Sequence, residues 1–377
     1  MELSAAKSAL FTLPMLLVTA FMLSAGKLPS GFEHWLSFAA VLAFFNTCFF
    51  MILRSGKTDR WRAPVFIALS LSFVFTFIAH MLEVRGTMAL KDSVMLEGGA
   101  PFCHVVIPQT LIPLLVSRTV IFPGTITGGY AAIGAMLFLW IGFSLALGRG
   151  WCGWGCFFGG LDDMFSRLRA APVINRINPK WTDISVAVLI VTALASAASL
   201  SPEYCKWLCP YKAVTEFPAV QNLATLIQML IFAALFIALV IALPLLTKKR
   251  TQCGLFCPFG AFQSLANRVN PFEMRVDTQN CAKCGACITA CPVFAMTQES
   301  LAAGKTRLNC IKCGKCADVC PKQAVYHHVK MTENRPSLAQ RLMFLFPAFM
   351  FLTTITGGML LQAVRRIVHF AGTGSFC

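Results

Sequence analysis

The sequence predicts an all-α, polytopic membrane bundle of about seven spans, with a small α+β domain inserted before the last span. Three observations support this fold class. The chain of 377 residues is 57% hydrophobic and only 13% charged, whereas soluble domains are about 25% charged. Apolar stretches of nearly helical-span length recur along the chain. A polar, cysteine-rich stretch interrupts them near the C-terminus.

A membrane-spanning helix needs about 20 apolar residues. Seven stretches approach this length: residues 9–24, 35–53, 63–82, 130–147, 184–199, 223–246 and 342–361. We interpret the first as a retained helix, because no clear signal-peptide cleavage site precedes Lys27.

Lysine and arginine concentrate in the loops 54–62 and 148–183 and in the segment 248–341. Basic residues favour the cytoplasmic side of a membrane. We therefore expect a multi-pass protein of the bacterial inner (cytoplasmic) membrane, with the inserted domain in the cytoplasm. Membrane lipid is then one partner, and the net charge of +16 partly reflects this topology.

The inserted domain carries two copies of one cysteine run, C-x2-C-x2-C-x3-C-P. In bacterial two-cluster ferredoxins, three cysteines of one copy bind one 4Fe–4S cluster and the fourth binds the other cluster. We expect one cluster on Cys281, Cys284, Cys287 and Cys320, and a second on Cys310, Cys313, Cys316 and Cys291. A disulfide framework has neither this spacing nor this repetition.

These motifs divide the chain into four parts. Residues 1–250 form a membrane domain with six spans and cysteine-pair loops, and residues 251–275 form a second cysteine-pair loop and linker. Residues 276–327 form the ferredoxin domain, and residues 328–377 form a linker, the seventh span and an outer tail.

A second cysteine pattern is also duplicated. Residues 149–159 and 250–260 both read R-x-x-C-G-x-x-C-x-F-G, each directly after a span. A parallel repeat about an axis along the membrane normal would bring the two copies face to face. Four thiolates would then bind a third iron–sulfur cluster at the inner membrane face: Cys152, Cys156, Cys253 and Cys257. The alternatives are two unrelated structural cysteine pairs or a zinc site.

Further cysteines fall in the predicted outer loops: Cys103, Cys205 and Cys209. These three would bind metal in a possible fourth cluster, with His104 or Cys377 as the remaining ligand. Such an outer site would lie at the opposite end of the bundle from the inner site. The alternatives are a Cys205–Cys209 disulfide or a thiol pair that awaits a partner.

The C-x-x-x-C-P loops at Cys205–Pro210 and Cys253–Pro258, followed by the eight ferredoxin cysteines, resemble the NapH/NosR type of membrane polyferredoxin. The resemblance covers roughly residues 130–325. It implies electron passage between the quinone pool or a cytoplasmic donor and a periplasmic reductase system, or support of metalloenzyme maturation. The chain departs from the family where Phe157, not proline, follows Cys156.

Other polar residues suggest fewer functions. His80 and Glu83 could line a quinol site, but a membrane-edge polar pair explains them as well. Asp162 and Asp163 are expected to be a charge pair at a helix N-terminus, and His327 and His328 a solvated linker. No phosphate-binding loop, nucleophile elbow or dinucleotide fingerprint occurs, and we expect no nucleic-acid partner.

We therefore expect a membrane-bound iron–sulfur protein that passes single electrons between a cytoplasmic partner, such as an acidic ferredoxin or flavodoxin, or a quinol, and an extracytoplasmic redox partner. No catalytic residue is predicted, so enzymatic activity is left open. The alternative is a maturation factor that reduces or transfers a metal through Cys103, Cys205 and Cys209.

Overall fold

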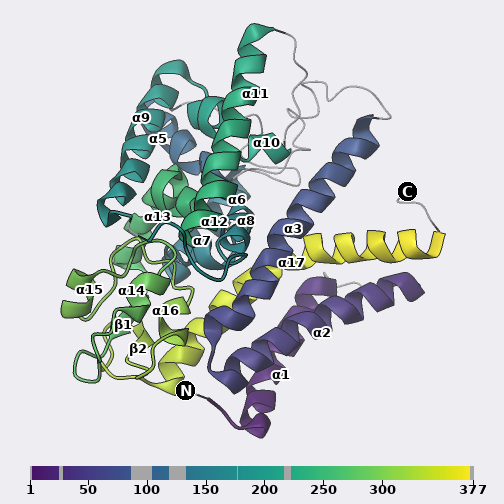
Figure 1. Ribbon diagram of the computed structural model, residues 1–377. Coiled ribbons are helices and arrows are strands. Elements are labelled where there is room, and N and C mark those ends of the chain that lie inside the picture. The colour runs from purple at the N-terminus through teal and green to yellow at the C-terminus, as the bar shows by residue number, and fades with distance from the viewer. Residues whose placement is uncertain are drawn as a thin grey trace.

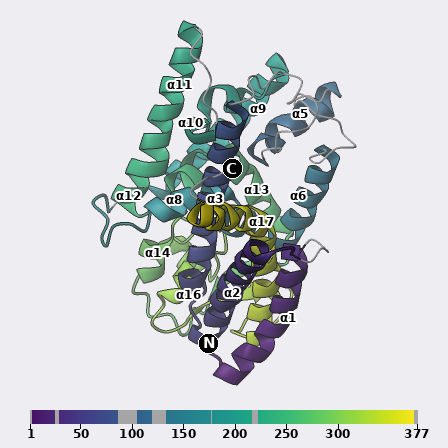
Figure 2. The same cartoon turned by 90° about the vertical axis from the view of Figure 1, so that its right-hand side faces the viewer.

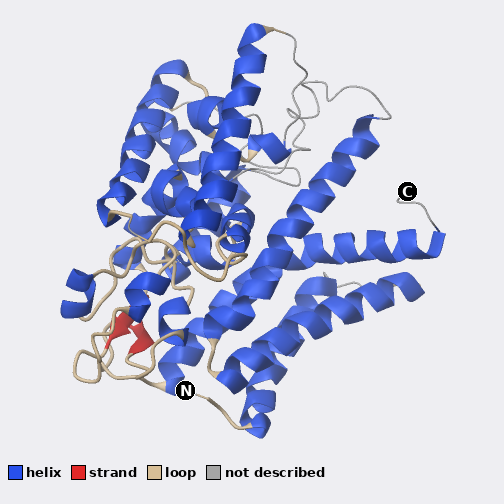
Figure 3. Cartoon of the chain, in the orientation of Figure 1, coloured by secondary structure: helices blue, strands red, loops and turns tan. Residues whose placement is uncertain are grey.

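A computed structural model describes residues 2–24, 29–85, 104–118, 133–175, 177–215 and 222–373. The described chain is mostly helical and contains one two-stranded sheet (Figure 3). Five helical segments are long and apolar enough to cross a membrane: Ala5–Ser24, Phe32–Ser55, Pro179–Ser199, Leu223–Thr247 and Leu338–Thr373. Length and composition thus support a membrane protein.

The predicted count of seven spans is not confirmed. The stretch 63–82 lies within α3 (Thr58–Arg85), which is not among these five segments. The stretch 130–147 forms only α6 (Ile133–Leu147), a helix of 15 residues. The other five predicted stretches fall within α1 (Ala5–Ser24), α2 (Phe32–Ser55), α9 (Asp183–Ser199), the α11–α12 segment and α17 (Leu338–Thr373).

The remaining helical elements before the small domain are short. They are η1 (His104–Val106), α5 (Ile107–Ser117), α7 (Gly150–Trp154), α8 (Phe157–Phe165), η2 (Pro179–Thr182), η3 (Tyr204–Leu208), α10 (Lys212–Thr215), α11 (Leu223–Leu235), η4 (Phe236–Ala242), α12 (Leu243–Thr247), η5 (Gln252–Phe256) and α13 (Pro258–Val269). The π-helical segments η3 and η5 each carry cysteine, and π-bulges frequently occur at functional sites.

The inserted domain is framed by an antiparallel pair of strands, β1 (Phe272–Val276) and β2 (Val325–Val329), with Phe272 opposite Val329. Between them lie α14 (Ala286–Ala290), α15 (Gln298–Ala302) and α16 (Lys315–Asp318). The strands therefore extend slightly beyond the expected limits of 276–327.

Figure 1 shows α1, α2 and the end of α17 on one side of α3, and α5, α9 and α11 on the other. In Figure 1 the small domain lies below α7 and α8, while α5 and α10 lie above them, and Figure 2 shows the same order around α8. Fully buried phenylalanines of α17, including Phe344, Phe349 and Phe351, fill the core.

The small domain is joined tightly to the helical bundle. The Asp318 carboxylate accepts hydrogen bonds from the backbone N–H groups of Thr58 (2.8 Å) and Arg60 (3.0 Å) at the start of α3. The buried Arg341 of α17 donates to the carbonyl oxygens of Ile52 and Gly56, each at 3.0 Å. The Asp318 bonds fix the small domain against the start of α3, and the Arg341 bonds fix α17, which follows the domain, against the end of α2.

Candidate iron–sulfur sites

The eight ferredoxin cysteines lie in two groups. One cavity is lined by Cys281, Cys284, Cys287 and Cys320. A second cavity is lined by Cys291, Cys310, Cys313 and Cys316. Each cavity thus takes three cysteines from one run and the fourth from the other, the same grouping that the spacing predicts. We call them the distal site and the proximal site.

The two sites differ in exposure. Cys284 of the distal site is exposed, whereas Cys310, Cys313 and Cys316 of the proximal site are buried. Burial raises the pKa of Cys316, and the charge of Cys287 from the distal site raises it further. The two sites are therefore close to each other. The distal site therefore faces solvent, and the proximal site lies behind it.

The proximal site contacts both copies of the duplicated motif. The backbone N–H of Arg250 donates to the carbonyl of Pro292 (2.8 Å), and the indole of Trp154 donates to the carbonyl of Lys312 (3.1 Å). The carbonyl oxygen of Ile311 lies so close to Gly153 that a Cβ there would overlap it.

The two motif copies exchange hydrogen bonds. Arg149 Nη2 donates to the carbonyl of Cys253 (2.8 Å), and Arg250 Nη2 donates to the carbonyl of Cys152 (2.9 Å). Both guanidinium groups are buried. The copies therefore meet face to face, with each arginine bound to the opposite copy.

The second cysteine of each copy lies at the N-terminus of a helix. Cys156 is the N-cap of α8 and Cys257 the N-cap of α13, both with extended backbone. The N–H of Gly159 donates to Cys156 Sγ at 3.4 Å, and a backbone hydrogen bond from Gly260 acts on Cys257 in the same way. Helix N-termini stabilise thiolates.

Burial nevertheless raises the pKa of all four thiols, with that of Cys257 reaching about 12. The nearby Arg149 and Arg250 act in the opposite direction on Cys152. Such thiols lose their protons when they bind a metal. We call Cys152, Cys156, Cys253 and Cys257 the four-thiol site.

The four-thiol site suits an iron–sulfur cluster. Four thiolates are the usual ligand set, and Arg250 Nη2 lies 3.2 Å from Cys253 Sγ. The buried atoms Arg250 Nε, Arg250 Nη1 and Arg149 Nε have no partner among the described residues, so donors remain for inorganic sulfide.

His104 lies at the four-thiol site, not at an outer site. Its Nε2 is 3.2 Å from Cys156 Sγ, and its ring contacts Phe157 and Phe259 with centroids 5.1 and 4.9 Å apart. The expectation that His104 completes an outer cluster is therefore wrong. The sequence gives no spacing from which this long-range contact could be predicted.

Cys205 and Cys209 also lie near the four-thiol site. The Tyr204 hydroxyl accepts a hydrogen bond from Gln252 Nε2 (3.0 Å), and the charges of Cys257, Cys209 and Cys205 add to the rise in the Tyr204 pKa that burial causes. Tyr211 stacks on Phe158, with ring centroids 4.0 Å apart. The segment between α9 and α11 thus returns into the bundle.

This return corrects the expectation that Cys205 and Cys209 lie at the opposite end of the bundle. Irregular backbone at this depth is tolerated because protein surrounds it. Cys103 and Cys377, the other expected contributors, lie outside the described residues, as do the side chains of His80 and Glu83.

Asp162 and Asp163, which were expected to be a charge pair at a helix N-terminus, lie within α8 and are buried. Asp162 Oδ2 accepts the backbone N–H of Cys253 (2.9 Å), and burial raises its pKa to about 7. Asp163 pairs with Arg62 and Arg167 at 3.2 and 3.0 Å. These two residues follow the Cys152–Cys156 loop, and the sequence alone does not show that both carboxylates are buried.

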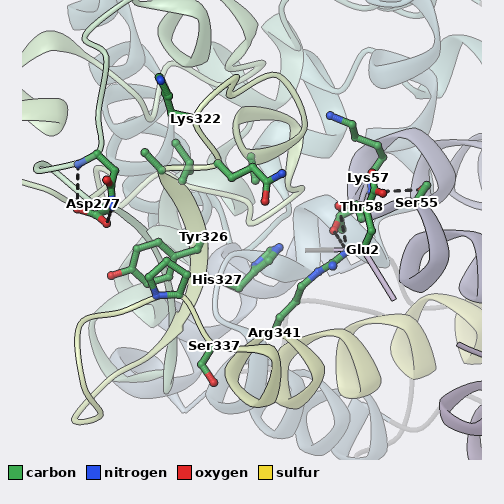
Figure 4. Close-up of a pocket in the computed structure, with 17 residues that line it drawn as sticks. Glu2, Ser55, Lys57, Thr58, Asp277, Lys322, Tyr326, His327, Ser337 and Arg341 are labelled. Carbon is green, nitrogen blue, oxygen red and sulfur yellow. Dashed lines mark hydrogen bonds between the residues drawn. The ribbon is translucent and has the colours of Figure 1, made fainter. Parts of the chain in front are cut away.

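His327 and His328 are buried on β2, not in a solvated linker. The His327 ring stacks on Phe344, with centroids 4.4 Å apart. It borders a cavity of about 260 Å³ near the α2–α3 turn and the start of α17, which Lys57, Lys322 and Arg341 also line (Figure 4). Adjacent residues of a strand point to opposite faces, so both histidines are buried because β2 has protein on both sides.

Two family profiles match the chain. A "4Fe-4S dicluster domain" matches residues 273–321. A "4Fe-4S binding domain" matches three times, at residues 129–174, 182–223 and 229–275. Each of the three matches contains one C-x3-C pair: Cys152–Cys156, Cys205–Cys209 and Cys253–Cys257. The chain therefore contains ferredoxin-type 4Fe–4S domains.

Curated relatives are weakly similar. The "Putative electron transport protein YccM" of Escherichia coli K12 is 28% identical over 45% of this chain and 48% of its own length. MJ0750 of Methanocaldococcus jannaschii is 28% identical over 46% of this chain and 71% of its own. The "Methylamine utilization ferredoxin-type protein MauN" of Methylobacillus flagellatus is 25% identical over 46% and 58%.

The matched region thus spans about half the length of YccM. No solved structure matches the chain. The relatives support an iron–sulfur electron-transport protein with ferredoxin-type domains. They do not specify the NapH/NosR type.

Proposed function

We propose that this protein is a membrane-bound iron–sulfur conductor, which passes single electrons between a cytoplasmic donor or quinol and an extracytoplasmic redox partner. The observation that carries the proposal is the direct contact between the proximal site and both halves of the four-thiol site. When bound, the clusters supply one-electron redox chemistry. The chain supplies thiolates, the distances between sites and the electrostatic surroundings of each.

The order of the sites follows from exposure and contact. The distal site, with exposed Cys284, is the point of exchange with a soluble partner. The buried proximal site comes next, because Lys249 Nζ donates to the Cys291 carbonyl (2.8 Å) directly before Arg250 of the four-thiol motif. The four-thiol site is third.

Cys205 and Cys209 continue this route toward the extracytoplasmic partner. Their loop is linked to the four-thiol site by the Tyr204–Gln252 bond of 3.0 Å, and the match of the 4Fe-4S binding profile over residues 182–223 supports a metal-binding role. With the ferredoxin pair and the four-thiol site the protein would hold three clusters in total, and four if this loop also binds one.

The cytoplasmic partner is an acidic redox protein such as a ferredoxin or flavodoxin. Lys283, between Cys281 and Cys284, and Lys322, two residues after Cys320, are exposed, and Lys57 borders the neighbouring cavity. Complementary charge steers such encounters and fixes orientation. Rates of reduction by an acidic donor should therefore fall with rising salt concentration.

The remaining finer features belong to the same proposal. They are a seven-span bacterial inner-membrane protein of the NapH/NosR type, a cytoplasmic ferredoxin domain at about residues 276–327, and membrane domains on either side. The orientation is tested by introducing single cysteines into the α2–α3 turn and labelling them from each side of the membrane.

An iron count per chain, with EPR of the reduced protein, tests the cofactor content. Eight irons would reject the four-thiol cluster, twelve would support it, and more would support a further cluster at Cys205 and Cys209. The variant Cys205→Ala separates conduction from metal maturation. Unchanged iron with lost copper binding would favour the maturation role.

A further inference from the structure

His104 breaks the symmetry of the four-thiol site. Phe158 and Phe259 occupy equivalent positions in the two motif copies, and the His104 ring contacts both, with centroids 6.0 and 4.9 Å apart. Its Nε2, however, meets only Cys156 Sγ, at 3.2 Å. The sulfur of Cys156 thus meets the Gly159 N–H and an imidazole nitrogen, whereas the equivalent Cys257 meets the Gly260 N–H and Cys253 Sγ meets the Arg250 guanidinium at 3.2 Å.

The direction of this bond follows from the chemistry of a ligand thiolate. A cysteine that binds iron carries no proton, so its sulfur can only accept a hydrogen bond. Nε2 must then be the protonated ring nitrogen. The surrounding aromatic side chains exclude water, since His104 is only 1% exposed, and a hydrogen bond is electrostatically stronger in such surroundings.

We propose that His104 is a positioning residue that donates a hydrogen bond from Nε2 to Cys156 and thereby raises the reduction potential of the four-thiol site. Hydrogen bonds to cluster sulfur are one of the protein's means of setting potential. Reduction adds negative charge, so a donor stabilises the reduced state more than the oxidised state. The inference rests on the proposed function, because it requires a cluster at this site.

The test compares His104→Phe, which fills the aromatic cage without a donor, with His104→Gln, which keeps an N–H donor. The measurement is a redox titration of the full-length protein in detergent, followed by EPR, with iron counted in parallel. His104→Phe should keep its iron and lower the potential of the third signal by about 59 mV, a tenfold change for one electron. His104→Gln should shift it less.

His369→Phe is the matched control, because His369 lies at the end of α17 beside Glu33, 3.3 Å away, and should change neither quantity. An unchanged potential in His104→Phe with full iron would overturn this inference but not the four-thiol cluster. Loss of about four irons in both His104 variants would also overturn it, since His104 would then be a ligand or a support. Absence of a third signal from the unmodified protein would reject the inference together with the four-thiol cluster.

Discussion

Arg149 and Arg250 each bind the backbone of the motif to which the other belongs, Arg149 at the carbonyl of Cys253 and Arg250 at that of Cys152. Neither copy of the motif satisfies its buried arginine alone. The exchange therefore brings four cysteines from two distant segments together. Hydrogen bonds to charged groups contribute about 1.5–3 kcal/mol each, enough to fix the two loops.

Replacement of either arginine should selectively weaken the four-thiol site. Arg149→Gln and Arg250→Gln each remove one cross-copy bond, and Arg250→Gln also removes the 3.2 Å contact with Cys253 Sγ. We expect Arg250→Gln to lose more of the third cluster, while the eight ferredoxin irons remain. Iron analysis and EPR measure this, with Arg268→Gln, at an exposed position, as the control. Equal loss of all clusters would show general unfolding instead.

Two equivalent glycines should respond unequally to alanine. A Cβ at Gly159 would overlap Arg250 Nη2, whereas a Cβ at Gly260 would lie 3.0 Å from Arg149 Nη2. Contacts of this kind in a packed interior cost about 1–3 kcal/mol. Gly159→Ala should therefore lower the unfolding midpoint more than Gly260→Ala. Gly358→Ala, with no atom within 4 Å of its Cβ, should have little effect, and the reverse order of the first two would contradict this packing.

The distal cluster should be lost before the others during oxidation. Cys284 is exposed, while Cys310, Cys313 and Cys316 are buried. Ferricyanide with a chelator should remove about four irons in a first phase. Mass spectrometry of alkylated cysteines should then show label at Cys281 and Cys284 before any label at Cys313. Simultaneous labelling of both sets would argue against the proposed order of sites.

Acid should destabilise the contact between β2 and α17. Burial lowers the pKa of His327 from 6.5 to about 3, with Arg341 and Lys312 acting in the same direction. The unfolded chain therefore binds a proton that the folded chain does not. The contribution of neutral His327 to the free energy of unfolding is complete above pH 6.5 and falls as pH decreases toward 3. The loss is about 2 kcal/mol at pH 5.

Denaturant unfolding at pH 7 and pH 5 measures this effect through tryptophan fluorescence. His327→Phe keeps a ring against Phe344 and should be less sensitive to acid than the unmodified protein. His369→Phe should leave the pH dependence unchanged. Equal pH dependence in all three proteins would show that His327 does not control this contact.

Cysteine spacing was sufficient to predict which ferredoxin cysteines lie together, because each run folds locally and its repetition specifies the exchange of the fourth cysteine. The duplicated R-x-x-C-G-x-x-C motif likewise predicted that two distant loops meet. The same reasoning failed at Cys205 and Cys209. Their position between two apolar stretches indicated an outer loop, but the shared C-x3-C pattern with Cys253 and Cys257 was the better guide.

The sequence by itself determined the apolar helices and the three kinds of cysteine motif, since both depend on composition and short spacing. Only the tertiary structure decided that Arg149 and Arg250 cross between motifs, that His104 reaches Cys156, and that His327 is buried. These contacts join residues far apart in the chain. They arise from the packing of helices against one another, which local sequence patterns do not encode.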